Sequence, residues 1–123
     1  MKRILISLTV IAVLVTASCY YDSEESLYPE LGSCDTVNVS YSASIYPLLN
    51  NNCLSCHSAK TSKDKGGDIT LEGYSNVVDY KEAILGSIRH ENGSKPMPKN
   101  GDKLKDCLIR QFEIWVDAGY PNN

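Results

Sequence analysis

The chain has 123 residues, with 12 Lys and Arg against 15 Asp and Glu, so its formal net charge is −3. This length allows one domain, and the acidic balance excludes a basic nucleic-acid-binding domain, so we expect no nucleic-acid partner. With one Phe and one Trp, a chain of this size buries a limited core by itself.

The first 18 residues are typical of an export signal. Lys2 and Arg3 precede an apolar run over residues 4–15, and Cys19 follows after small residues. Small residues before a Cys resemble the lipobox of bacterial lipoproteins, in which that Cys is acylated. We therefore predict a lipoprotein signal peptide over 1–18, lipidation at Cys19, and a location in the bacterial periplasm or at the outer-membrane surface. Simple secretory cleavage and an N-terminal membrane anchor are the alternatives.

Residues 19–33 are polar and acidic and lack helical periodicity, and Pro29 and Gly32 interrupt them. We predict an acidic tether here, followed by a folded domain over residues 34–123. A merely disordered terminus is the alternative. Without residues 1–18 the chain keeps 10 basic and 15 acidic residues, a formal net charge of −5.

An apolar stripe at helical spacing opens the folded domain. Proline is tolerated only in the first turn of a helix, so Pro47 predicts a helix that begins near Ser44. The stripe consists of Tyr41, Ile45, Leu48, Leu49 and Cys53.

The stripe leads into Cys53-Leu54-Ser55-Cys56-His57, and a C-x-x-C-H run is the attachment signature of a c-type haem. The Cys53 and Cys56 thiols can each add across one haem vinyl group, and His57 then falls under the iron as its proximal ligand. One covalently bound haem c is the predicted cofactor. A zinc site would need a fourth ligand from Cys34, Cys107 or His90. A thioredoxin-like redox motif is the other alternative for these cysteines, and it would lie in a βαβ unit, which this sequence does not indicate.

The remaining elements are also helical or irregular. We predict a polar loop over 58–68, a short helical piece over 75–79, a helix over 81–89 and a loop over 91–101. An apolar stripe from Leu104 to Val116 predicts the last helix, with a stop at Gly119 and Pro121. No segment alternates as a strand would, so the predicted class is all-α, with three to four helices.

Met97 lies between two prolines and is the only Met after residue 18. It is the predicted second axial ligand of the iron, because His with Met is the ligand pair of electron-carrying cytochromes. His90, as part of a bis-His site, is the alternative. Lysines follow the Cys-His motif and surround the Met turn, and could steer acidic partners unless they are ordinary solvated loop residues: Lys60, Lys63, Lys65, Lys95, Lys99 and Lys103.

Together these residues resemble the class I cytochrome c family over roughly residues 40–120. Small bacterial members show a Gly-Gly, a Met-Pro turn and a closing Trp-x-x-x-Gly, which look like Gly66-Gly67, Met97-Pro98 and Trp115 to Gly119. In many members a Pro carbonyl accepts the ring N–H of the axial His, but no Pro lies between His57 and Pro96. The acceptor here is therefore open.

The resemblance implies that the first and last helices cross, which would bring Cys34 and Cys107 into the same neighbourhood. Two thiols left over in an oxidising compartment usually pair, so these two are disulfide candidates. Two buried free thiols are the alternative.

The predicted function is transfer of single electrons between exported redox proteins, by a monomer held to the membrane through its lipid alone. The sequence shows no sign of a catalytic acid–base pair or nucleophile, so we do not predict an enzyme. A haem-based sensor with a displaceable sixth ligand and a haem subunit tethered to a larger oxidoreductase are the alternatives. Carbon monoxide binding to the reduced protein would distinguish the sensor.

Overall fold

The computed structural model describes residues 34–123. The predicted signal peptide, the lipidation site Cys19 and the tether over 19–33 lie outside the described residues. Helices and connecting turns make up the described part, and it contains no strand, so the all-α class is confirmed there.

The chain begins its first helical unit with a wide turn. Segment η1 (Tyr41–Ile45) is π-helical, and α3 (Tyr46–Asn52) continues from it. The Ser40 hydroxyl accepts a hydrogen bond from the Ala43 N–H at 3.1 Å and caps the start. Pro47 lies in the first turn of α3, where its missing N–H costs least. The start predicted near Ser44 thus falls inside η1.

Two single-turn helices follow, α4 (Leu54–His57) and α5 (Ser62–Lys65). The turn α5 lies within the segment predicted as a polar loop. Its sequence, Ser-Lys-Asp-Lys, has no apolar residue, and hydrophobic periodicity therefore gives no signal for it.

Helix α6 (Tyr74–Arg89) is one continuous helix of 16 residues, so the prediction of two pieces, over 75–79 and 81–89, was wrong. The apolar pattern is interrupted at Lys81, whose side chain stays half-buried. Its Nζ lies 4.9 Å from the centroid of the Tyr120 ring and donates to the Val78 carbonyl. The aliphatic stem of Lys81 thus occupies a place in the helix that an apolar residue would otherwise take.

Helix α7 (Asp106–Asp117) is the last helix, and its apolar stripe was predicted. Leu104 is buried but precedes the helix. The tail folds back against this helix, because the Trp115 ring N–H donates to the Pro121 carbonyl at 2.9 Å.

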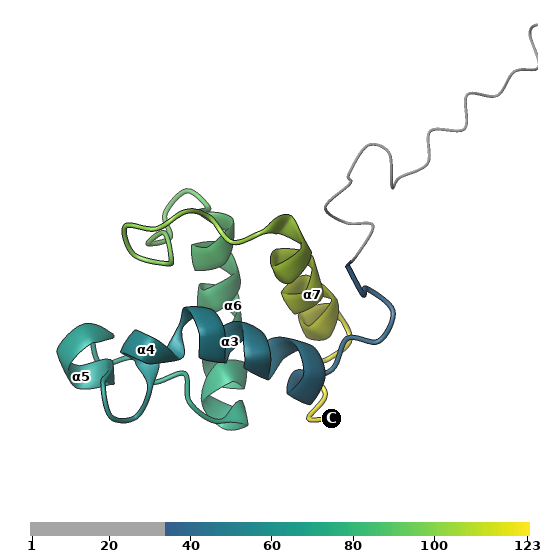
Figure 1. Ribbon diagram of the computed structural model, residues 1–123, viewed down its shortest axis with the longest axis horizontal. Helices are drawn as coiled ribbons and strands as arrows, with labels where there is room; N and C mark the ends of the chain where they lie inside the picture. Colours follow the sequence, from purple (N-terminus) through teal and green to yellow (C-terminus); the bar gives the residue numbers. More distant parts are fainter. Residues whose placement is uncertain (1–33) are drawn as a thin grey trace, which may run out of the picture. The chain divides into compact units, whose positions relative to one another are not determined.

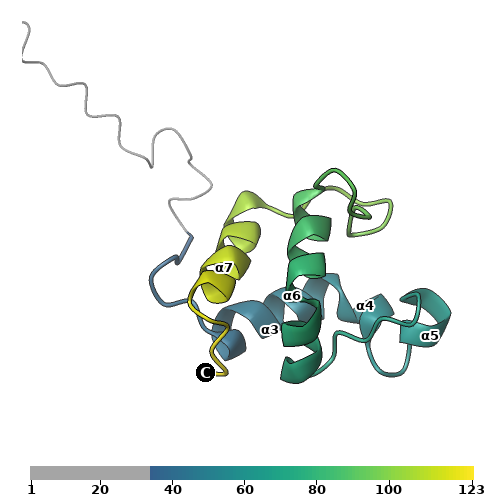
Figure 2. The ribbon, with the colours of Figure 1, turned by 180° about the vertical axis from the view of Figure 1, so that it is seen from behind.

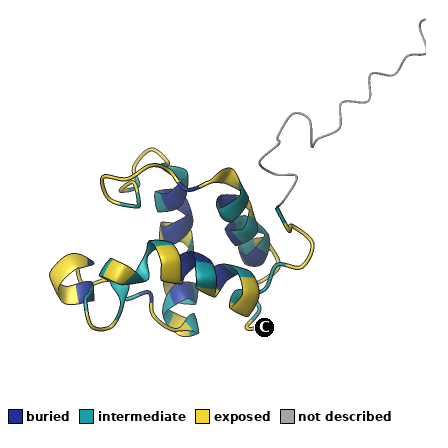
Figure 3. Ribbon diagram, viewed as in Figure 1, coloured by how far each residue is buried: buried dark blue, intermediate teal, exposed yellow. Residues whose placement is uncertain are grey.

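The helices form two layers (Figures 1 and 2). Helices α6 and α7 lie side by side, and η1 with α3 crosses them. The residues coloured as buried concentrate where the layers meet (Figure 3). Trp115 lies in this core, with its ring 5.8 Å from that of Tyr41. The core comprises Ile45, Leu48, Leu49, Leu71, Val77, Ile84, Leu85, Ile88, Leu104, Ile109, Phe112 and Trp115.

Cys34 and Cys107 form a disulfide, with their Cα atoms 5.7 Å apart. It joins the first residue of the described part to the first turn of α7. None of the helices in residues 34–123 has the length and hydrophobicity that a membrane span requires.

Candidate functional site

The C-x-x-C-H residues form a single closed turn. The Cys53 carbonyl accepts from the backbone N–H groups of Cys56 at 3.0 Å and His57 at 2.9 Å. Cys53 itself donates to the Leu49 carbonyl at 2.8 Å. Because Leu49 is buried in the core, the turn is anchored to the rigid end of α3, and both thiols come from this one turn.

Cys53 and Cys56 are the free cysteines of the described part, and both are half-buried. Burial raises the pKa of the Cys53 thiol to about 11. At neutral pH this side chain is therefore a neutral thiol in this structure.

The orientation of the His57 ring is fixed by the backbone. Its Nδ1 lies 2.9 Å from the Ile69 carbonyl oxygen. A carbonyl can only accept, so Nδ1 carries the proton and, in the neutral ring, Nε2 keeps the lone pair. That is the tautomer in which an imidazole binds a metal through Nε2.

The segment that supplies this carbonyl runs close to the Cys-His turn. The Leu71 N–H donates to the His57 carbonyl at 2.8 Å, so a second hydrogen bond joins the two segments beside the one at Ile69 O. Gly66 permits the approach. A Cβ at Gly66 would lie 2.6 Å from the Cys56 carbonyl oxygen and 3.0 Å from His57 Nδ1.

Met97 is half-buried in the segment between α6 and α7. Its backbone N–H donates to the Ser87 carbonyl at 3.1 Å, and His90 Nε2 lies 3.1 Å from its carbonyl oxygen. Figures 1 and 2 both show this segment and α4 at the same end of the domain, away from the C-terminus.

The ligands that a zinc site could have recruited are engaged elsewhere. Cys34 and Cys107 are bonded to each other, and Nε2 of His90 faces the Met97 carbonyl. No group of three or more His, Cys, Asp and Glu side chains in residues 34–123 is arranged to hold a metal ion.

The donor chemistry of this turn fits a covalently attached haem. Two free thiols share one turn with an imidazole whose Nε2 lone pair is available, and the chain between α6 and α7, which contains Met97, loops out on the same side of the domain as α4 in Figures 1 and 2. Cys53, Cys56 and His57 would hold the group from one side, with Met97 as the candidate ligand for the other.

Two contacts near this site were not predicted from the sequence, that of His57 with the Ile69 carbonyl and that of His90 with Met97. The Ile69 carbonyl is a backbone group, and nothing in the sequence marks one carbonyl among many. The contact of His90 with Met97 depends on how the 91–97 segment folds back along α6. The sequence signal for the first contact was the Gly66-Gly67 pair, because a glycine has no Cβ and permits a close backbone approach.

Comparison of the chain with protein-family models, curated proteins and solved structures gave no match. The functional argument therefore rests on the residues and their geometry.

Proposed function

We propose that this chain is a monohaem c-type cytochrome that carries single electrons between exported redox partners, not an enzyme. Cys53 and Cys56 attach the haem, and His57 and Met97 ligate its iron. The observation that carries the proposal is the hydrogen bond from His57 Nδ1 to the Ile69 carbonyl, which leaves Nε2 free on the same turn as two unbonded thiols.

Bound haem would supply an iron that alternates between the ferric and ferrous states. The chain's own contribution is to hold the ligands still. The Cys-His turn is bonded to α3 and to the segment at Ile69, and Met97 is bonded to α6. Ligands fixed in this way favour electron transfer with little rearrangement, as in the class I cytochromes c that the sequence resembles.

The partner surface in this proposal is the end of the domain that carries the predicted lysines. Lys60, Lys63 and Lys65 on and beside α5, and Lys95 and Lys99 beside Met97, are all exposed. Positive charge at this end would attract an acidic docking face and raise the association rate at low salt. The protein works as a monomer that is held at the bacterial periplasm or outer-membrane surface by a lipid on Cys19.

The first test is Met97→Ala, made in the full chain matured with haem. Axial ligands set haem potentials over a range of about 0.8 V, so loss of the thioether should lower the reduction potential by on the order of 0.1 V. Potentiometry measures this shift, and the weak far-red band of Met-ligated ferric haem should disappear. The control is Val116→Ala, which removes apolar atoms from α7.

An unchanged potential in Met97→Ala would contradict the ligand assignment. Carbon monoxide binding to the reduced wild-type protein would favour a haem-based sensor instead. If the protein carries no covalent haem when it is produced under conditions that mature other c-type cytochromes, the proposal as a whole is contradicted.

A further inference from the structure

Both backbone polar groups of Met97 are bonded to the end of one helix. Its N–H donates to the Ser87 carbonyl at 3.1 Å, and Ser87 lies in the last turn of α6. Its carbonyl oxygen lies 3.1 Å from His90 Nε2. Since a carbonyl only accepts, His90 Nε2 carries the proton and donates.

The backbone of His90 also turns the chain back toward α6. His90 is the C-cap of this helix and has left-handed dihedral angles, φ 57° and ψ 41°. After it, the Glu91 N–H donates to the Gly86 carbonyl at 3.0 Å. Gly86 lets the returning segment pass, because a Cβ there would lie 2.5 Å from Ser94 Oγ. The segment before Met97 therefore packs directly on the helix.

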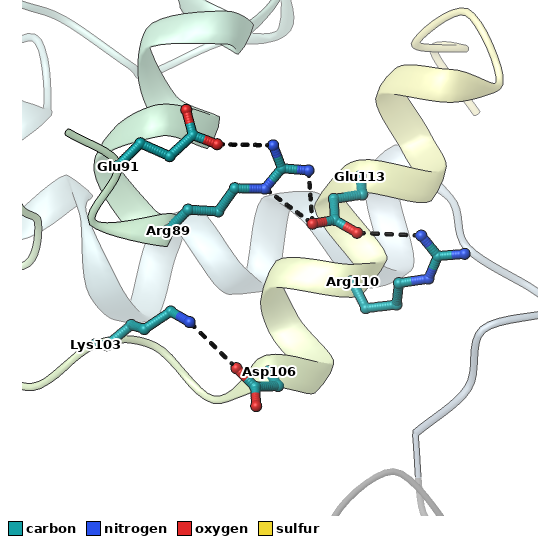
Figure 4. Close-up of polar contacts among 6 residues, drawn as sticks. All are labelled: Arg89, Glu91, Lys103, Asp106, Arg110 and Glu113. Carbon is teal, nitrogen blue, oxygen red and sulfur yellow. Dashed lines mark hydrogen bonds and ion pairs between the residues drawn. The ribbon is translucent and has the colours of Figure 1, made fainter. Parts of the chain in front are cut away.

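This end of α6 is itself fixed to α7. The Arg89 guanidinium donates from Nε at 2.9 Å and from Nη2 at 2.7 Å to one oxygen of Glu113 (Figure 4). Arg110 donates to the other oxygen at 3.1 Å. Met97 is thus connected by hydrogen bonds to the core-forming helices.

We infer that His90 is a positioning residue that holds Met97 for ligation through the bond from His90 Nε2 to the Met97 carbonyl. The inference rests on the proposed function, because it concerns the ligand named there. A Met side chain has three rotatable bonds, so a fixed backbone reduces the conformational freedom that the thioether must lose on binding. It also gives His90 a role other than that of an iron ligand.

The test compares His90→Asn with His90→Gln in the haem-matured full chain. Asn tolerates the left-handed backbone but places its amide nitrogen where Nδ1 was, too close to the backbone to reach Met97. Gln places its amide nitrogen near the former Nε2 position and can donate in its place. The two variants separate the hydrogen bond from the backbone role.

The measurement is imidazole binding to the ferric protein, followed by loss of the far-red band, because imidazole competes with Met97 for the iron. Loss of one neutral hydrogen bond corresponds to roughly a fivefold change in an equilibrium constant. We expect His90→Asn to bind imidazole about fivefold more tightly than wild type, and His90→Gln to stay near wild type. Thermal melting of each variant reports whether the domain is folded.

Wild-type imidazole affinity in a folded His90→Asn protein would overturn the inference and leave the proposed function standing. Equal changes in the Asn and Gln variants would also overturn it, because the effect would then come from the backbone turn. Absence of the far-red band in the wild type would remove the His57/Met97 assignment, and the inference with it.

Discussion

A backbone carbonyl, not another side chain, orients the candidate iron ligand His57. The ring N–H of His57 reaches Ile69 O at 2.9 Å, and the segment that carries this carbonyl comes close because position 66 has no Cβ. Gly66 has ordinary dihedral angles, φ −96° and ψ 4°. Glycine is therefore required at this position for its small size, since other residues could adopt the same dihedral angles.

Gly66→Ala should destabilise the domain by about 1–3 kcal/mol, because the new methyl group would overlap the Cys56 carbonyl and press on the His57 ring. Thermal unfolding of the two proteins measures the difference. The control is Gly101→Ala, where the nearest atom to the added Cβ is Pro98 Cβ at an ordinary 3.4 Å. If both variants melt at the same temperature, the close approach at Gly66 does not constrain the fold.

At the scale of single residues, the sequence predicts which neighbouring residues share a turn, but it does not predict contacts between residues that are far apart in the chain. Cys53, Cys56 and His57 lie within five consecutive residues, so their spacing alone places them on one turn. The acceptor Ile69 lies 12 residues beyond His57, and its position depends on the turn α5, which has no apolar pattern. His90 was considered as a rival to Met97, and the structure brings the two into contact.

Among the elements, the contact between α6 and α7 combines apolar packing with a charged cluster. Arg89 comes from the last turn of α6, and Glu113 and Arg110 come from α7 (Figure 4). Burial raises the pKa of the Glu113 carboxyl, but hydrogen bonds from Arg89 and Arg110 outweigh it. The net pKa is lower than the ordinary 4.5.

Glu113→Gln should lower the free energy of unfolding by about 1 kcal/mol at pH 7, a modest value because Arg89 is 35% exposed. A lowered folded-state pKa stabilises the protein above the unfolded value of 4.5. This contribution is lost as the pH falls through the folded value. The difference between variant and wild type should therefore shrink below pH 4.5 in denaturant titrations. Glu82→Gln, at an exposed site on α6, is the control, and equal losses in both variants would contradict the role of the cluster.

The presence of the long helices was easier to predict from the sequence than the residues at which each helix begins and ends. Helix α7 has a continuous apolar stripe, and the prediction located it within a few residues. Helix α6 was predicted as two pieces, over 75–79 and 81–89, but it is continuous, and the half-buried Lys81 at its middle lies with Nζ over the Tyr120 ring. A hydrophobic pattern depends only on the type of residue at each position. It therefore counts Lys as polar even where the aliphatic part of the side chain is buried.

On the scale of the whole domain, the two ends of the described chain meet at the same helix. The disulfide ties Cys34 to Cys107 at the start of α7, and Gln111 on α7 donates to the Asp35 carbonyl at 2.9 Å. The tail returns to the other end of α7 through the bond from Trp115 to Pro121. Helix α7 therefore organises both termini of the domain, which sequence spacing alone could not establish.

The disulfide should contribute a large part of the domain's stability. It closes a loop with a sequence separation of 73, which in the chain-entropy model corresponds to about 4 kcal/mol, against about 5–15 kcal/mol for a typical domain. The double variant Cys34→Ser/Cys107→Ser should therefore melt well below wild type under oxidising conditions. Adding a reductant should bring the melting temperature of the wild type down to that of the variant and leave the variant unchanged, since in the proposed haem-bound protein Cys53 and Cys56 would be thioethers, which such reductants do not cleave. A wild-type melting temperature that does not respond to reductant would show that the Gln111 contact and the helix packing hold this end of the domain without the covalent bond.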